Sequence, residues 1–187
     1  MQILPHWTDS IQAPSITLAM DQILATMITL TTYGTWLRGD QRGWVENGKT
    51  LPPDPELETA DRHRSQHKPF LFAESQFLSV GRCIGDSLRQ RKNVALLALT
   101  VQSWHCHVVM GPTDHPIPDI VKCAKDAARY GLCVGRPIWT DGYDKRFCFD
   151  RAAVRNRIDY VERHNLELGL PAKPWDFIVP FARAQPL

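Results

Sequence analysis

The fold of this chain is decided by one stretch, Val94-Ala95-Leu96-Leu97-Ala98-Leu99-Thr100-Val101-Gln102-Ser103-Trp104-His105-Cys106-His107-Val108-Val109-Met110. Its first eight residues form a continuous apolar run, which is typical of a strand buried on both faces. Gln102 and Ser103 suit a turn, and residues 104–110 then form the antiparallel partner strand. The stretch therefore predicts a buried strand and its antiparallel partner.

The segments on either side of this pair supply the other elements. We expect strands over residues 24–33 and 145–149, and helices over about residues 75–90, 117–130 and 151–167. Gly131 stands where the second helix should stop, and Asp150 is placed to cap the third. The order strand, helix, two strands, helix, strand, helix indicates an α+β domain with helices packed on an antiparallel sheet.

Two histidines alternate with apolar residues on the second strand of the pair. Because alternate residues of a strand share a face, one face carries Trp104, Cys106, Val108 and Met110 and is expected in the core. His105 and His107 then project together from the other face, close enough to bind one divalent cation. Two ordinary packed or surface histidines remain an equal alternative from this motif alone.

A second group of polar residues is expected on the last helix, beside a core stripe of Val154, Ile158 and Val161. Tyr160 and His164 are four residues apart, so both lie on one helical face at the flank of that stripe. A nucleophile and a third metal ligand one turn apart would suit a catalytic site. The alternative is a half-buried tyrosine and a histidine that faces solvent.

Composition and charge narrow the class of protein. The 187 residues are enough for one domain with a hydrophobic core, and 43% of them are apolar. We expect a loose tail over residues 1–20 and a single domain over residues 21–187. Five cysteines without a CxxC pair argue against a disulfide framework and favour a cytoplasmic location. No apolar run is long enough to span a membrane, and the net charge of +2 announces no nucleic-acid partner by itself.

Residues 31–44 and 50–69 differ from the rest of the chain. The first segment contains three glycines and two tryptophans and predicts a structured turn. The second is polar and proline-rich, and we expect a surface excursion with one short helical piece. His63 and His67 within it have helical spacing but are interpreted as a surface pair.

Three motifs together resemble one known family. They are Tyr33-Gly34-Thr35-Trp36-Leu37-x-Gly39-Asp40-x-Arg42-Gly43, Trp104-His105-Cys106-His107-Val108-Val109 and Ile158-Asp159-Tyr160-Val161-x-x-His164-Asn165. In this order and at this length they resemble the REP-associated tyrosine transposases, which belong to the single-tyrosine HUH endonucleases (His, hydrophobic residue, His). The resemblance covers most of the chain from about Ile28 onward and implies a ferredoxin-like HUH nuclease fold.

The resemblance implies a DNA transposase and single-strand endonuclease that cleaves and rejoins hairpin DNA. Tyr160 would be the nucleophile and form a 5′-phosphotyrosine, and His105 and His107 would bind Mg²⁺ or Mn²⁺. His164 is expected as the third ligand; relatives often carry Asn-Pro near this point, so Asn165 is the nearest substitute. The chain would be a monomer or homodimer associated with the nucleoid.

Candidates for DNA contact are less well located by the sequence. Tyr33 and Trp36 could stack on unpaired bases, although packing of their own loop is an equal alternative. The cations expected to contact phosphates are Arg38, Arg42, Arg89, Arg91 and Lys92. Two other functions remain open: an inactive DNA-binding protein of the same fold, and a metal-dependent hydrolase that uses the histidines. A metal-free structural or interaction domain is a further possibility.

Overall fold

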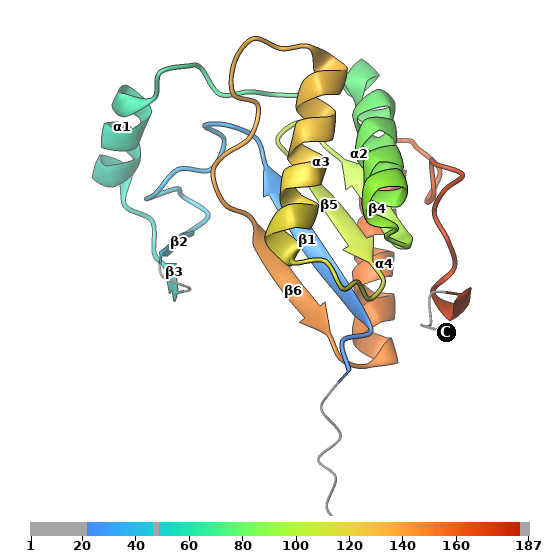
Figure 1. Ribbon diagram of the computed structural model, residues 1–187. Helices are drawn as coiled ribbons and strands as arrows, with labels where there is room; N and C mark the ends of the chain where they lie inside the picture. Colours follow the sequence, from blue (N-terminus) through green and yellow to red (C-terminus); the bar gives the residue numbers. More distant parts are fainter. Residues whose placement is uncertain (1–21, 47–48, 184–187) are drawn as a thin grey trace, which may run out of the picture.

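A four-stranded antiparallel sheet forms the centre of the molecule (Figure 1). The computed structural model describes residues 22–46 and 49–183, so the expected tail over residues 1–20 lies outside the described residues. The strands are β1 (Ala25–Thr31), β4 (Leu96–Val101), β5 (His105–Met110) and β6 (Asp144–Cys148), and they lie in the order β4-β5-β1-β6. With the intervening helices this is the β-α-β-β-α-β arrangement of ferredoxin-like folds. The expected α+β fold is confirmed.

Helices cover both faces of the sheet. The helices α2 (Phe77–Lys92) and α3 (Ile117–Leu132) pack side by side on the front face in Figure 1. The third long helix, α4 (Arg151–Glu167), crosses behind the sheet and contacts β4 and β5. Every residue of β4 and β5 is buried, because both strands are covered on both sides. The predicted buried strand and its antiparallel partner are thus confirmed, and β4 lies at one edge of the sheet.

One helix end follows the local sequence and another departs from it. Asp150 accepts a hydrogen bond from the backbone N–H of Ala153 at 2.7 Å, so α4 begins where its cap predicts. The predicted stop of α3 at Gly131 is wrong, since the helix continues to Leu132 and Cys133 takes the left-handed conformation at φ 51°. Gly131 has a packing role instead: a Cβ there would lie 2.5 Å from the Cys83 sulfur.

The glycines of α2 give room to the C-terminal segment. A Cβ on Gly81 would lie 2.0 Å from the Trp175 ring, and one on Gly85 would lie 2.0 Å from the Phe177 ring. The missing side chains of these two glycines therefore permit close packing of the two rings on α2. A short 3₁₀ turn, Glu74–Gln76, directly precedes α2, and another, Phe181–Arg183, follows the C-terminal segment.

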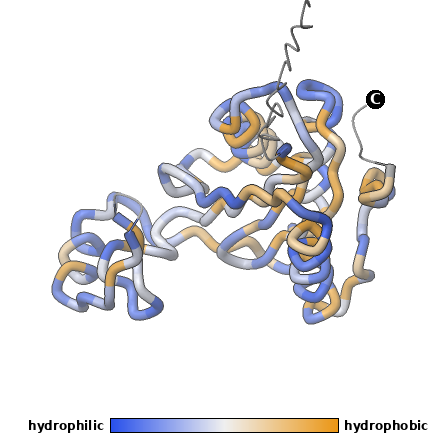
Figure 2. Tube along the Cα trace, turned by 90° about the horizontal axis from the view of Figure 1, so that it is seen from below, coloured by the Kyte–Doolittle hydropathy of each residue, from blue (hydrophilic) through white to orange (hydrophobic). Residues whose placement is uncertain are grey.

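A small lobe extends from the end of the sheet at which β1 ends. We call residues 39–46 and 49–64 the arm; it contains β2 (Trp44–Glu46), β3 (Lys49–Leu51) and α1 (Pro55–Arg64). The arm stands apart from the sheet in both views (Figures 1 and 2). The predicted short helical piece is confirmed as α1, whereas the sequence did not predict the β2–β3 hairpin. Among the described residues, no helix is long and apolar enough to cross a membrane.

Candidate metal centre

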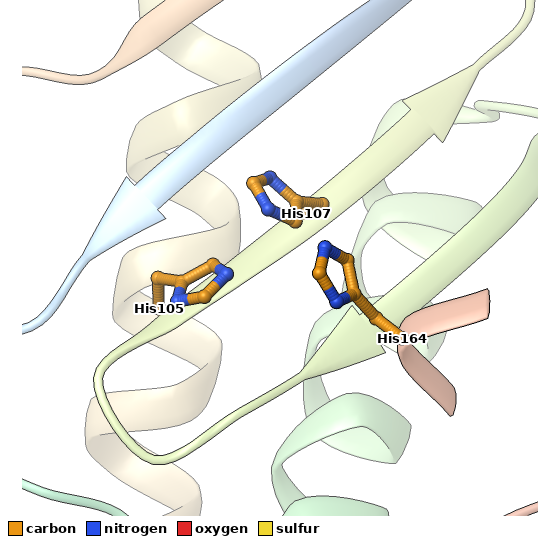
Figure 3. A group of neighbouring side chains, drawn as sticks. All are labelled: His105, His107 and His164. Carbon is orange, nitrogen blue, oxygen red and sulfur yellow. The ribbon is translucent and has the colours of Figure 1, made fainter. Parts of the chain in front are cut away.

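Three histidines from two elements converge on the face of the sheet that α4 covers (Figure 3). His105 and His107 lie on β5 and point to the face covered by α4, as their alternation predicts. His164 comes from α4, near its C-terminal end. One ring nitrogen from each histidine lies within 4.8 Å of those of the other two. Packing of α4 against β5 thus brings His164 next to two residues that lie 57 and 59 positions earlier in the sequence.

Each of the three rings has a buried nitrogen without a partner among the described residues. These atoms are Nδ1 of His105, Nε2 of His107 and Nε2 of His164. A buried polar atom without a hydrogen bond costs roughly 1–3 kcal/mol. Three such atoms in one cluster indicate that something else satisfies them, and nitrogen donors at this separation fit a divalent metal ion. The donor set therefore fits a divalent metal ion, the class of ligand that the paired histidines predict.

The opposite nitrogens of two rings are held by other side chains. Nδ1 of His107 lies 2.9 Å from Oγ1 of Thr29 on β1, and Nδ1 of His164 lies 3.2 Å from a carboxylate oxygen of Glu167. Such contacts fix the ring orientation and the tautomer of a histidine that binds metal. Neither residue belongs to the sites that the sequence predicts. The i, i+3 spacing of His164 and Glu167 could have indicated one of them, whereas the strand register that places Thr29 opposite His107 is not visible in the sequence.

Burial keeps the two strand histidines neutral at physiological pH. Desolvation, with a smaller contribution from neighbouring His164, lowers the pKa of His105 to about 4. Desolvation and the charges of His105 and His164 lower the pKa of His107 to about 3. Neutral imidazoles are the form that binds metal, so the site needs no deprotonation at pH 7.

Tyr160 lies against the histidine cluster. Its ring centroid is 4.5 Å from that of His164 and 5.4 Å from that of His107, both in edge-to-face arrangements. The expectation that Tyr160 and His164 share one face of α4 is confirmed. The tyrosine keeps 37% of its surface exposed, while His105 and His107 keep only 5%. The arrangement places an accessible hydroxyl-bearing side chain beside a buried set of nitrogen donors.

Trp104 departs from its predicted place in the core. It precedes β5, is half-buried, and its ring centroid is 3.9 Å from that of His105 and 6.1 Å from that of Trp36. The strand alternation fails at this residue because the regular strand begins only at His105. Trp104 therefore belongs to the wall of the histidine cluster rather than to the core.

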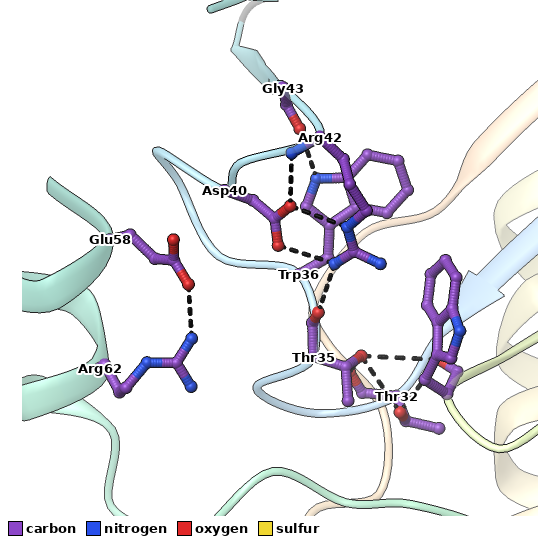
Figure 4. Close-up of polar contacts among 9 residues, drawn as sticks. Thr32, Thr35, Trp36, Asp40, Arg42, Gly43, Glu58 and Arg62 are labelled. Atoms are coloured by element: carbon purple, nitrogen blue, oxygen red, sulfur yellow. Dashed lines mark hydrogen bonds and ion pairs between the residues drawn. The ribbon is translucent and has the colours of Figure 1, made fainter. Parts of the chain in front are cut away.

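A polar network holds the turn after β1 next to this tryptophan (Figure 4). Arg42 binds both carboxylate oxygens of Asp40 at 2.8 and 2.7 Å and donates to the carbonyl oxygen of Thr35 at 2.7 Å. Its guanidinium carbon lies 4.6 Å from the Trp104 ring centroid and 5.1 Å from that of Trp36. Arg42, predicted to contact phosphates, is thus already engaged by its own loop, as is Trp36, whose indole donates to the carbonyl oxygen of Gly43.

The remaining predicted DNA contacts are dispersed. Arg38 forms a two-point ion pair with Asp61 of the arm, and Tyr33 packs partly on the core with its ring near His67. His63 and His67 are both exposed, as expected of a surface pair. Three cations lie at the end of α2, on the front face and toward the end of the sheet where Leu96 pairs with Met110: Arg89, Arg91 and Lys92. The structure does not bring these three to the histidines.

Asn165 has a structural position rather than one at the cluster. It is 1% exposed, and its side-chain N–H groups donate to the carbonyl oxygens of Leu99 and Ala172, both at 2.9 Å. These bonds tie α4 to β4 and to the segment after the helix. Of the two candidates for a third ligand, only His164 lies among the converging nitrogens.

Comparison with known proteins gives structural similarity at low identity. No protein-family model and no curated protein sequence matches the chain. The chain is similar to a REP-associated tyrosine transposase bound to a REP hairpin, with 12% identity over 82% of this chain and 74% of that one, at a TM-score of 0.47. It is also similar to a chain assigned as a transposase from Deinococcus radiodurans R1, with 19% identity over 76% and 91% of the two chains, at a TM-score of 0.41. Since both TM-scores lie below 0.5, the cluster's own residues remain the basis for inferring function.

Proposed function

We propose that this chain is a metal-dependent DNA-strand transferase in which Tyr160 is the nucleophile. The observation that carries the proposal is the set of three unpartnered ring nitrogens within 4.8 Å of one another, with the Tyr160 ring against two of those rings. A simple packed histidine pair would leave no reason for three buried nitrogens to lack partners. The substrate class, single-stranded or hairpin DNA, follows from the resemblance of the three sequence motifs.

His105, His107 and His164 would hold the ion. When bound, Mn²⁺ or Mg²⁺ supplies positive charge that polarises a phosphate oxygen and stabilises the charge that develops on it. Of the two ions, we propose that Mn²⁺ binds more tightly, because Mg²⁺ prefers oxygen ligands and the ligands of this set are nitrogens. Thr29 and Glu167 hold two of the rings in the orientation that directs the free nitrogens inward.

Tyr160 would carry out the covalent step. Its phenolic oxygen attacks the phosphorus of a phosphodiester, the O–P bond to Tyr160 forms, and the bond from phosphorus to the 3′ oxygen breaks. The phenol loses a proton and the departing 3′ oxygen gains one, so no net proton is consumed. The product is a 5′-phosphotyrosine and a free 3′-hydroxyl, and attack by a 3′-hydroxyl in reverse rejoins a strand. Phosphodiester exchange of this kind needs no nucleoside triphosphate.

The experiment that tests the proposal separates the covalent step from binding. Wild type, Tyr160→Phe and Tyr130→Phe are incubated with end-labelled hairpin DNA and Mn²⁺ and resolved on a denaturing gel. Tyr130 is a matched control, because it is 71% exposed and lies on α3, across the sheet from the cluster. We expect a DNA–protein adduct from wild type and Tyr130→Phe and none from Tyr160→Phe. Cleavage without an adduct in all three would favour the metal-dependent hydrolase, and DNA binding without cleavage would favour the inactive DNA binder.

A further inference from the structure

A cavity lies where the arm joins the body of the molecule. Its volume is about 420 Å³, and its walls come from the turn after β1 and from the last turn of α1 with the segment that follows. The lining side chains that bear on its chemistry are Leu37, Arg62, Gln66, His67 and Lys68. A volume of this size is in the range of sites that bind small organic molecules rather than a bare ion.

The walls of the cavity are held in place by backbone contacts. The N–H of Phe70 donates to the carbonyl oxygen of Tyr33 at 2.8 Å, which ties the segment after α1 to the end of β1. The guanidinium of Arg136 donates to the carbonyl oxygen of Lys68. Gly34 has φ 71°, and a Cβ on it would lie 3.2 Å from the Cα of Pro69, so the two backbones meet directly. The cavity is therefore preformed.

The lining is positive in character. Arg62 and Lys68 are cations and His67 can become one, whereas none of the described residues that line the cavity is acidic. Arg62 is paired with Glu58, but Lys68, Gln66 and His67 are exposed and their side chains form no hydrogen bond with any of the described residues. Cations with free donors bind phosphate oxygens. The amide of Gln66 adds a donor and an acceptor, as recognition of a base edge requires.

The cavity is connected to the histidine cluster through one short turn. The N–H of Thr32 donates to the carbonyl oxygen of Trp104 at 2.8 Å, and the hydroxyl of Thr35 donates to the carbonyl oxygen of Thr32 at 2.7 Å. Gly34 lies between these threonines and lines the cavity, while Trp104 packs against His105. The cavity and the cluster therefore lie at the same end of the sheet.

We propose that this cavity binds one unpaired nucleotide of the DNA strand that is cleaved at the histidine cluster, with Lys68 on a phosphate and Gln66 on the base. The proposal rests on the proposed function for the identity of the strand. The cavity supplies what the cluster lacks, namely a separate place to fix a nucleotide at the same end of the sheet. Its occupant would position the strand and contribute affinity without taking part in the reaction.

Binding is measured in a Tyr160→Phe background, so that affinity is read without cleavage. Fluorescence anisotropy compares Lys68→Ala and Gln66→Ala with Lys92→Ala, a matched loss of charge at the far end of α2. Each variant is titrated with a hairpin flanked by unpaired nucleotides on both sides of the cleavage position, and with versions truncated on either side. Circular dichroism verifies that the variants are folded.

We expect Lys68→Ala and Gln66→Ala to weaken binding of the long strand about tenfold, with no loss on the strand truncated at the side that reaches the cavity. Loss of one phosphate contact should also lower the salt dependence of binding by about one unit in Lys68→Ala but not in Gln66→Ala. Losses no larger than those of Lys92→Ala, losses that persist on both truncated strands, or no binding by the parent chain would overturn the proposal. If the cavity variants weaken binding as expected but wild type forms no DNA–protein adduct, the strand-transferase proposal would be overturned and the cavity proposal would stand.

Discussion

Thr29 and His107 are direct partners across β1 and β5, and Oγ1 of the threonine lies 2.9 Å from Nδ1 of the histidine. This contact leaves Nε2 of His107 as the nitrogen directed into the cluster, where it has no partner among the described residues. One hydroxyl on a neighbouring strand thus determines which nitrogen of His107 is available to a metal ion.

Replacing this hydroxyl by a methyl group should weaken metal binding without disturbing the strand. We expect Thr29→Val to lower Mn²⁺ affinity about ten- to a hundredfold, because loss of an outer contact to a metal-binding histidine typically has this effect. Thr29→Ser keeps the hydroxyl and should retain the affinity. Isothermal titration of the folded variants with Mn²⁺ measures the difference, and equal affinity of Thr29→Val and wild type would show that the contact does not orient the ring.

The buried histidines should make the metal-free protein less stable in mild acid. In the unfolded chain both side chains protonate near pH 6.5, whereas the folded protein holds the pKa of His105 at about 4 and that of His107 at about 3. Between pH 6.5 and about pH 4, the unfolded state therefore binds more protons than the folded state does. The contribution of the two histidines to the free energy of unfolding is fully present above pH 6.5. It is lost as the pH is lowered toward 4, by about 1.4 kcal/mol per pH unit for each histidine.

Urea unfolding at several pH values between 7 and 4.5, with a chelator present, tests this expectation. The double variant His105→Gln/His107→Gln should show a flatter dependence of the unfolding free energy on pH. His63→Gln serves as the control, because His63 is exposed in the arm, and it should retain the slope of the wild type. The same slope in the double variant as in wild type would exclude the two buried histidines as its source.

The sequence was sufficient for elements whose signals are local. The cap at Asp150 and the apolar stripe of Val154, Ile158 and Val161 predicted α4 with its observed bounds and its inward face. The alternation of β5 placed His105 and His107 on one face, and the spacing of Tyr160 and His164 placed them on the same face of a helix. The convergence of strand and helix was an inference from family resemblance rather than from these patterns.

Features that depend on contacts between distant segments were not predictable in this way. Strand alternation predicts Trp104 in the core only if the strand is extended one residue too far, and Trp104 lies instead against Trp36 and His105. The hairpin of the arm has strands of only three residues each, too short for a periodic signal. Phosphate contacts were assigned from charge alone, which does not reveal that Arg42 is already bound to Asp40.

Arg42 should contribute to the stability of the turn beside the cluster. Its guanidinium binds the carboxylate of Asp40, and this ion pair lowers the pKa of Asp40 below its ordinary value. It also lies over the Trp36 and Trp104 rings. We expect Arg42→Lys to lower the free energy of unfolding by roughly 1–2 kcal/mol, because an ammonium reproduces neither the two-point pair nor the stacking.

A matched control for Arg42 is Arg38→Lys, whose two-point pair with Asp61 lies on the exposed arm without a stacked ring. It should lower the free energy of unfolding less than Arg42→Lys does, because exposed ion pairs contribute little to stability. Thermal or urea unfolding of both variants measures the two effects. An equal, small effect at both positions would mean that the stacking on Trp36 and Trp104 adds nothing to the fold.

His164 and Asn165 are neighbours on α4. Substitution of His164 should mainly lower Mn²⁺ affinity, whereas substitution of Asn165 should mainly lower the free energy of unfolding. Truncation of Asn165 to Ala removes two donors from the carbonyl oxygens of Leu99 and Ala172 and should lower the free energy of unfolding by about 2–4 kcal/mol. The nitrogens of the cluster are unchanged by that substitution, so the Mn²⁺ affinity of the folded variant should stay near that of wild type. His164→Ala removes a half-buried ring whose free nitrogen belongs to the cluster. It should lower Mn²⁺ affinity at least tenfold and cost little stability in the presence of a chelator. If Asn165→Ala instead lost Mn²⁺ affinity while His164→Ala kept it, the third ligand would be the amide, and α4 would have to turn from its observed orientation to bind metal.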